Sequence, residues 1–193
     1  MLARDNPFST DRVLSVRYRP QGATWDSLMA RLEALGRRAA IVGPEGSGKT
    51  TLLEDLAPRL RKCGFAVRTA AVTREAPRIP RQAEDALVGG IGPRDVLLFD
   101  GADLLPWLDW RRLRRRTAGA GGLVITMHKP GRLPTLVTCA TSPALLQEIV
   151  EALLGPGEAG AWRGRAEALY ARHRGNLREA LRELYDIYAA EER

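Results

Sequence analysis

Eight consecutive residues carry the strongest chemical signal in the chain. Residues 43–50 read Gly-Pro-Glu-Gly-Ser-Gly-Lys-Thr and fit the phosphate-binding pattern G-x-x-x-x-G-K-[ST]. Glycines in such a loop let successive backbone N–H groups point at a phosphate, while Lys49 would reach the β- and γ-phosphates. The Thr50 hydroxyl would occupy one Mg²⁺ position. The predicted phosphate-binding residues are Gly43, Pro44, Glu45, Gly46, Ser47, Gly48, Lys49, Thr50 and Thr51.

The flanks of this loop support the prediction. Residues 39–42 form an apolar run that suits a buried strand, and residues 51–60 have the leucine spacing of a helix with one apolar face. A strand, a glycine loop and a helix in this order place bound phosphates at a helix N-terminus.

A second candidate residue follows a strand-like run further along the chain. Residues 96–99 are apolar and lead directly into Asp100. At the carboxyl end of a parallel strand, Asp100 would lie beside the phosphate loop, in the crevice where such sheets bind ligands. We expect Asp100 to hold the water shell of a Mg²⁺ ion, with a hydrogen bond to Thr50.

The remaining pattern predicts the elements that position these residues. Strands alternate with helices as far as residue 138, and helices alone follow from Ser142, which predicts a parallel sheet with a small helical lid. We therefore expect an α/β P-loop NTPase fold of three layers with a five-stranded, mainly parallel sheet. The expected domains are an arm with a helix at 1–38, irregular as far as Pro20, a nucleotide-binding core at 39–141 and a lid at 142–193. Strands are expected at 39–42, 65–72, 96–99, 123–126 and 136–138, and helices at 25–35, 51–63, 82–88, 106–117, 143–154, 162–173 and after Asn176.

Composition limits the class of protein. The 193 residues are 45% hydrophobic, enough for one α/β domain with an appendage, and no run reaches the roughly 18 apolar residues of a membrane span. Asp5 and Pro7 interrupt the N-terminal stretch that a signal peptide would need. Cys63 and Cys139 lack metal-ligand spacing, which fits a reducing compartment, and we expect a cytoplasmic protein.

The net charge of +7 is concentrated in one segment. Residues 104–132 hold seven basic residues and one acidic residue. A basic helical face could contact nucleic-acid phosphates, dock an acidic protein, or simply be a solvated face in a chain whose cations are mostly arginine. Trp107 and Trp110 are expected to lie on the opposite face of this helix, which packs on the protein core. The arginines expected on its exposed face are Arg111, Arg112, Arg115 and Arg116.

With these motifs in view, the chain resembles the AAA+ type of P-loop ATPases, including small transposition-associated and initiator-type ATPases. Residues 97–105 resemble their second motif, in which a catalytic glutamate directly follows the aspartate. Here Gly101 stands in that place, and Asp103 is the nearest acidic candidate to substitute for it. The resemblance implies binding of ATP with Mg²⁺ and places hydrolysis in question.

The same resemblance implies roles for four other residues. Thr126, at the end of the fourth strand, would sense the γ-phosphate, and His128 resembles the switch histidine of ABC-type relatives. The alternative is that Thr126 is a buried strand residue and His128 a loop residue. In Gly-Asn-Leu-Arg at 175–178, Asn176 would cap the last helix, and Arg178 would point to the γ-phosphate. If copies assemble in rings or filaments, Arg132 is the candidate arginine finger, and residues 18–20 would help to hold adenine.

Three functions remain open at this point. The first is an ATP-binding AAA+-like ATPase or switch that acts on a protein or DNA partner, with hydrolysis weakened by Gly101. The second is a P-loop kinase of a nucleotide or small molecule, which the chain length permits. The third is a regulatory module that binds ATP without turning it over.

Overall fold

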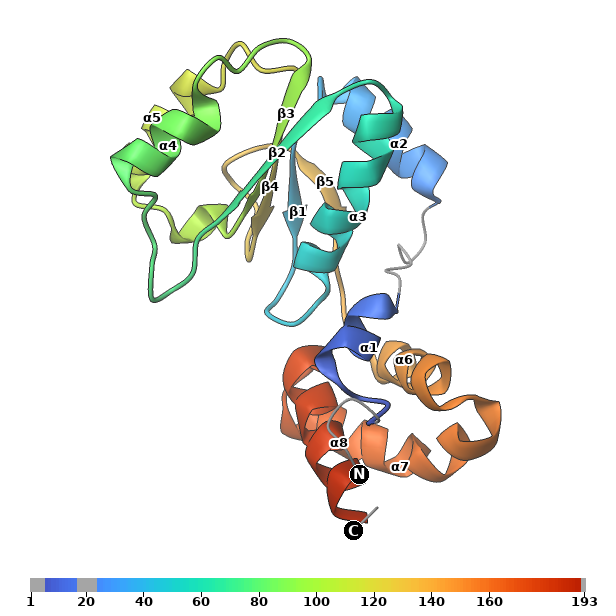
Figure 1. Cartoon of the computed structure of the whole chain (residues 1–193). Helices are drawn as coiled ribbons and strands as arrows, with labels where there is room; N and C mark the ends of the chain where they lie inside the picture. Colours follow the sequence, from blue (N-terminus) through green and yellow to red (C-terminus); the bar gives the residue numbers. More distant parts are fainter. Residues whose placement is uncertain (1–5, 17–23, 192–193) are drawn as a thin grey trace. The chain divides into compact units, whose positions relative to one another are not determined.

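The computed structural model describes residues 6–16 and 24–191, which form two compact units (Figure 1). The sheet unit comprises the described residues from 24 to 43 and from 49 to 139. The helical unit comprises residues 6–16, 44–48 and 140–191. Within the described ranges, no helix is long and apolar enough to cross a membrane.

The sheet unit is built on five strands that all pair in parallel, in the order β2-β3-β4-β1-β5. Each of the five predicted strands is confirmed, with ends within two residues of the expected ones. The strands are β1 (Arg38–Val42), β2 (Ala66–Ala71), β3 (Asp95–Asp100), β4 (Gly122–Met127) and β5 (Thr135–Thr138). Because β1 lies between β4 and β5, the loop after β1 leaves the sheet next to the ends of β4 and β5, with the end of β3 one strand further away.

Helices cover both faces of this sheet, which gives the predicted three layers (Figure 1). On one side lie α2 (Trp25–Ala34) and α3 (Lys49–Lys62), and on the other α4 (Arg81–Val88) and α5 (Trp107–Arg116). A short 3₁₀ helix, Ala102–Leu104, links β3 to the segment before α5. Gly64 ends α3 with a left-handed φ of 86°, and the Phe65 N–H donates to the Leu60 carbonyl at 3.1 Å.

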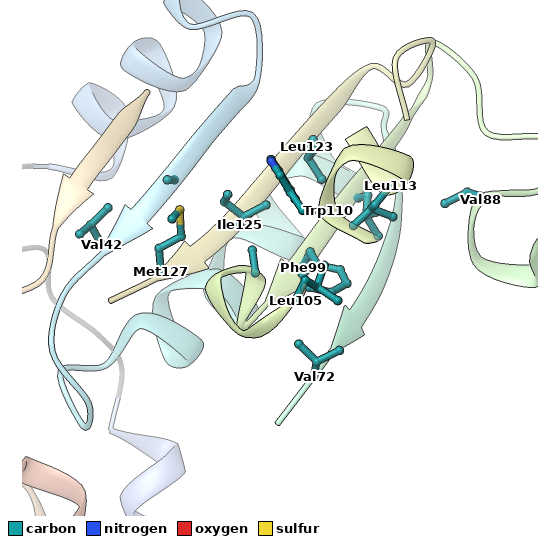
Figure 2. Close-up of a cluster of buried hydrophobic side chains, with 13 residues drawn as sticks. Val42, Val72, Val88, Phe99, Leu105, Trp110, Leu113, Leu123, Ile125 and Met127 are labelled. Atoms are coloured by element: carbon teal, nitrogen blue, oxygen red, sulfur yellow. The ribbon is translucent and has the colours of Figure 1, made fainter. Parts of the chain in front are cut away.

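The core lies where α5 packs on the central strands (Figure 2). Phe99 and Ile125 are completely buried there, as their positions in the middle of a two-sided parallel sheet require. Trp110 and Leu113 of α5 close the cluster from the helix side. The prediction that Trp110 is a core residue is therefore confirmed. The packing of Trp110 determines which face of α5 is exposed to solvent.

Helices alone make up most of the helical unit. These are α1 (Thr10–Ser15), α6 (Pro143–Leu154), α7 (Pro156–Arg172) and α8 (Leu177–Glu191). Two expectations were wrong here. The N-terminal arm contains a helix, and α7 starts at Pro156 because a proline suits the first helical position, where no N–H partner is needed.

Aromatic packing joins the arm to the C-terminal helices. The rings of Phe8, Trp162 and Tyr188 lie 5.6–5.9 Å apart between centroids. The buried Asn6 side chain donates to the Tyr185 carbonyl at 2.9 Å and accepts from the Phe8 N–H at 2.9 Å. These contacts hold residues 6–16 in the same unit as α6, α7 and α8.

Candidate functional site

The glycine loop joins β1 to α3, as the sequence predicts. Gly46 and Gly48 have φ values of 71° and 81°, a region that glycine adopts without strain. Ser47 is buried, and its hydroxyl donates to the Pro44 carbonyl at 2.8 Å, which closes the turn. Lys49 is the first residue of α3 and is only 9% exposed. The loop is therefore a compact turn that depends on its glycines, and its role in phosphate binding stays a prediction.

Three predicted site residues come together in the sheet unit. The Thr50 hydroxyl donates to Asp100 Oδ2 at 2.9 Å, and the Thr126 hydroxyl donates to Asp100 Oδ1. Thr126 Oγ1 also accepts from the Gly101 N–H at 2.8 Å. Thr126 is 1% exposed, so it is a buried strand residue and a direct partner of Asp100 at once.

This cluster fits a small hard cation. Thr50 and Asp100 present hydroxyl and carboxylate oxygens, the donor types that Mg²⁺ prefers, and they already lie within hydrogen-bonding distance of each other. Such an ion would neutralise part of the phosphate charge at this end of the loop. Among the described residues, no group of three or more histidine, cysteine or carboxylate side chains has the arrangement of a metal site.

The position next to Asp100 has no room for a side chain. Gly101 has a left-handed φ of 78°, and a Cβ built there would lie 2.6 Å from the Val72 carbonyl oxygen. That carbonyl belongs to backbone held by a 3.1 Å hydrogen bond from the Val72 N–H to the Asp100 carbonyl. A glutamate at position 101 would therefore clash with the Val72 carbonyl oxygen, which gives the glycine a steric explanation.

Asp103 lies one turn further on and pairs with His128. Asp103 Oδ2 is 2.6 Å from His128 Nδ1 and also accepts from the His128 backbone N–H at 3.2 Å. Asp103 Oδ1 is buried and accepts no hydrogen bond within the described residues. Burial raises the pKa of Asp103, but the hydrogen bonds from His128 outweigh that effect and leave the pKa below its usual value. The carboxyl group is therefore ionised at neutral pH.

Arg132 binds the backbone of the 3₁₀ helix that carries Asp103. Its guanidinium donates to the carbonyl oxygens of Ala102 and Leu105, the second at 2.7 Å, and lies 5.2 Å from the centre of the Trp110 ring. Arg132 thereby satisfies carbonyls at the end of the 3₁₀ helix that carries Asp103. Its role as an arginine finger toward another copy stays a prediction.

The segment before α8 behaves as its sequence predicts. Asn176 Oδ1 accepts from the backbone N–H groups of Arg178 and Glu179 at 3.1 and 3.3 Å, so Asn176 caps the helix. Within the helical unit, Gly46 of the loop lies against this cap, since a Cβ at Gly46 would be 2.0 Å from Asn176 Oδ1. The Arg178 side chain is exposed, and its role toward a γ-phosphate stays a prediction. Residues 18–20 lie outside the described residues.

The arginines of α5 divide into two kinds, where the sequence predicted one exposed set. Arg112 makes a two-pronged ion pair with the buried Glu84 of α4, with Nη2 to Oε2 at 2.6 Å, and a second pair with Asp109 at 2.9 Å. Arg116 contacts Glu84 at 3.3 Å and Asp85 at 2.6 Å. Both side chains are about two-thirds buried. The expectation that Arg112 and Arg116 lie on the exposed face of the helix was therefore wrong. The carboxylate of Glu84 is what draws them toward α4.

Trp107 corrects a second expectation about α5. Its side chain is 63% exposed and Leu108 is 69% exposed, so Trp107 faces solvent and not the core. The guanidinium of Arg111 lies 5.2 Å from the centre of the Trp107 ring. Arg111 and Arg115 are exposed and have no acidic partner within the described residues. A hollow of about 370 Å³ on this face is lined by Leu108, Arg111, Arg112, Arg115 and Arg116.

The chain is similar to known proteins in its three-dimensional structure and not in its sequence. No family model matches the chain, and no curated protein sequence matches it. The solved structure of the RuvB Holliday junction branch migration motor of Thermotoga maritima superposes with a TM-score of 0.58 at 19% identity, over 88% of this chain and 63% of RuvB. The chain has the P-loop NTPase fold of the RuvB structures.

Single-residue variants of RuvB give the same result. A threonine-to-valine variant of the Thermotoga maritima protein superposes with a TM-score of 0.57 at 19% identity, over 88% of this chain and 63% of RuvB. For a lysine-to-arginine variant the TM-score is 0.55 at 17% identity, over 86% and 63%. The chain thus spans less than two thirds of the RuvB chains that it resembles, and at this level of identity the likeness concerns the fold.

Proposed function

We propose that the chain binds ATP with Mg²⁺ and hydrolyses it to act on a protein or DNA partner. The observation that carries the proposal is the continuous contact from Thr50 through Asp100 to Thr126 at the end of the glycine loop. Thr50 and Asp100, which share one hydrogen bond beside the glycine loop, would hold a Mg²⁺ ion that supplies positive charge at the phosphates of a nucleotide.

Each loop residue has a defined part in this proposal. Backbone N–H groups of residues 45–48 would cradle the β-phosphate, and the Lys49 ammonium would contact the β- and γ-phosphates. Thr50 and Asp100 would hold Mg²⁺, which supplies charge neutralisation at the phosphates. Arg178, on the exposed first turn of α8, would add a further positive charge.

Nucleotide binding is tested by removing the phosphate lysine. Lys49→Ala should weaken ATP binding by at least about tenfold, since hydrogen bonds to charged groups contribute about 1.5–3 kcal/mol. Lys62→Ala removes the same charge from the exposed last turn of the same helix and should bind ATP as the parent does. Equal binding by the parent and Lys49→Ala would refute the nucleotide site. Transfer of the γ-phosphate to an acceptor other than water would favour the kinase alternative.

A nucleic-acid partner is the first one to test, for two reasons. The similar RuvB structure is described as a Holliday junction branch migration motor. Arg111 and Arg115 lie four residues apart on α5, exposed and without acidic partners in the described ranges, beside the exposed ring of Trp107. Cations of this kind bind phosphates, and an exposed indole offers a surface for an unpaired base.

Salt dependence tests this surface directly. Replacing Arg111 and Arg115 by alanine should lower the slope of log affinity against log salt for single-stranded DNA by about 1.4, because each lost phosphate contact removes about 0.7. A matched control replaces Arg61 and Arg182, two other exposed arginines, and leaves the same net charge. If both double variants lose the same affinity, the binding is a general effect of charge and α5 is not the interface. Tight binding of an acidic peptide in place of DNA would also refute a nucleic-acid role.

A further inference from the structure

The cluster of Thr50, Asp100 and Thr126 lacks a group that is available to take a proton from water. A glutamate beside Asp100 is excluded, because any side chain at Gly101 meets the Val72 carbonyl at 2.6 Å. Asp100 itself is occupied on both oxygens, by Thr50 and by Thr126. A proton acceptor for ATP hydrolysis must therefore come from another position.

His128 lies at the right edge of the sheet for this task. It directly follows Met127, the last residue of β4, whose carbonyl accepts the Gly43 N–H at 3.1 Å. Val42 and Met127 are paired in the register of β1 and β4, and Figure 2 shows both at the ends of neighbouring strands. His128 is thus level with the start of the glycine loop, two residues beyond the Thr126 that contacts Asp100.

The pairing with Asp103 determines how the imidazole carries its proton. An ionised carboxylate can only accept hydrogen bonds, so the contact of 2.6 Å requires that His128 Nδ1 carries the hydrogen. In the neutral ring the other nitrogen, Nε2, then holds a lone pair. The ring is one-third exposed, so water can reach it.

Asp103 is also placed to stabilise a protonated His128. Its Oδ2 accepts from both the ring and the backbone of His128, and its Oδ1 is buried and accepts no hydrogen bond in the described ranges. A positive charge on the imidazole would strengthen this interaction in a partly dehydrated setting. The guanidinium of Arg132 holds the backbone on either side of Asp103 and so keeps the carboxylate in place.

We propose that Asp103 and His128 act as the base that activates water for ATP hydrolysis in this chain. The inference rests on the ATP site proposed above. A water oxygen forms a bond to the γ-phosphorus while the bond from that phosphorus to the β,γ-bridging oxygen breaks, and the electron pair leaves with ADP. The proton of the water passes to His128 Nε2, and Asp103 stabilises the resulting imidazolium. The proton is later released to solvent with the phosphate.

Substitution of His128 tests the proposal, and the chain contains a second histidine that serves as the control. It has two histidines, and His173 also pairs with a carboxylate, with Nε2 2.6 Å from Glu183 Oε2 in the helical unit. His128→Ala should lower kcat by about 100-fold or more, the usual contribution of a general base, with ATP affinity unchanged within about twofold. His173→Ala should leave both quantities unchanged. Asp103→Asn should lower kcat by at least about tenfold, because the ring loses its orienting partner.

Two further readouts separate a catalytic role from a structural one. Added imidazole should restore part of the hydrolysis to His128→Gly but none to Asp103→Asn, in which His128 remains. In the NMR spectrum of the nucleotide-free protein, the Nδ1-bound proton of His128 should be observable and should be lost in Asp103→Asn, with His173 as the internal reference.

The outcomes distinguish this inference from the proposed function. If the parent binds ATP and His128→Ala retains its kcat within about twofold, the dyad is refuted and the ATP site stands. Tight ATP binding with no hydrolysis by the parent also refutes the dyad. Failure of the parent to bind ATP refutes the proposed function itself.

Discussion

Replacing Gly101 by alanine tests whether the backbone beside Asp100 truly excludes a side chain. Two costs add at this position. A left-handed conformation costs an L-residue about 1–2 kcal/mol, and overpacking against fixed structure costs about 1–3 kcal/mol. The second cost arises because the new Cβ would lie 2.6 Å from the Val72 carbonyl oxygen. We expect the free energy of unfolding to fall by about 2–5 kcal/mol, which corresponds to a loss in Tm of about 4–20 °C for a chain of this length.

Two other glycines separate these costs in a urea or thermal unfolding assay. Gly64 has a φ of 86°, and a Cβ added to it would have no atom within 4 Å, so Gly64→Ala should lose only the conformational part, about 1–2 kcal/mol. Gly119 has neither a left-handed φ nor a close neighbour, and Gly119→Ala should stay within about 1 kcal/mol of the parent. If Gly101→Ala is no less stable than Gly64→Ala, the contact with Val72 relaxes at little cost and the steric reasoning fails.

Three further variants test other parts of the structure by unfolding measurements. Glu84→Gln should lose about 3 kcal/mol, because it removes the buried charge that two arginines of α5 share, while the exposed Asp85→Asn should be nearly neutral. Phe8→Ala should destabilise the helical unit by about 3–5 kcal/mol through its lost aromatic contacts. Because the pKa of Asp103 is lowered in the folded state, its contribution is present above the unfolded value of about 3.9 and is lost as the pH falls through the folded value. The difference between the parent and Asp103→Asn should therefore be largest near pH 7 and shrink below about pH 4.

Local patterns were sufficient to predict the sheet and the loop. The apolar runs before Gly43 and Asp100 are short and bounded by glycine or acid, as buried parallel strands require, and each lies where it is expected. The cap at Asn176 was predictable for the same reason, since its partners are two and three residues away.

Contacts between distant segments were not predictable in this way. The sequence shows that position 101 is glycine and not glutamate, but it does not show why. The carbonyl that excludes a side chain there belongs to Val72, just beyond the end of another strand. Asp103 and His128 were each candidates, yet their pairing depends on β3 and β4 being neighbours in the sheet. Helical spacing predicted that Trp107 and Trp110 share a buried face. Trp107 is the first residue of α5 and is exposed, whereas Trp110 is buried.

The aromatic contact of Phe8 with Trp162 and Tyr188 has a consequence for the order of folding during synthesis. The strands of the sheet unit all lie between residues 38 and 138, so a nascent chain can pair them before α7 and α8 exist. The arm emerges before the strands but finds its partners after them, since Asn6 and Tyr185 are 179 residues apart. Closing so long a loop is slow compared with forming local contacts. Until translation passes Tyr188, Phe8 lacks one of its ring partners, and we expect the arm to stay open to proteolysis.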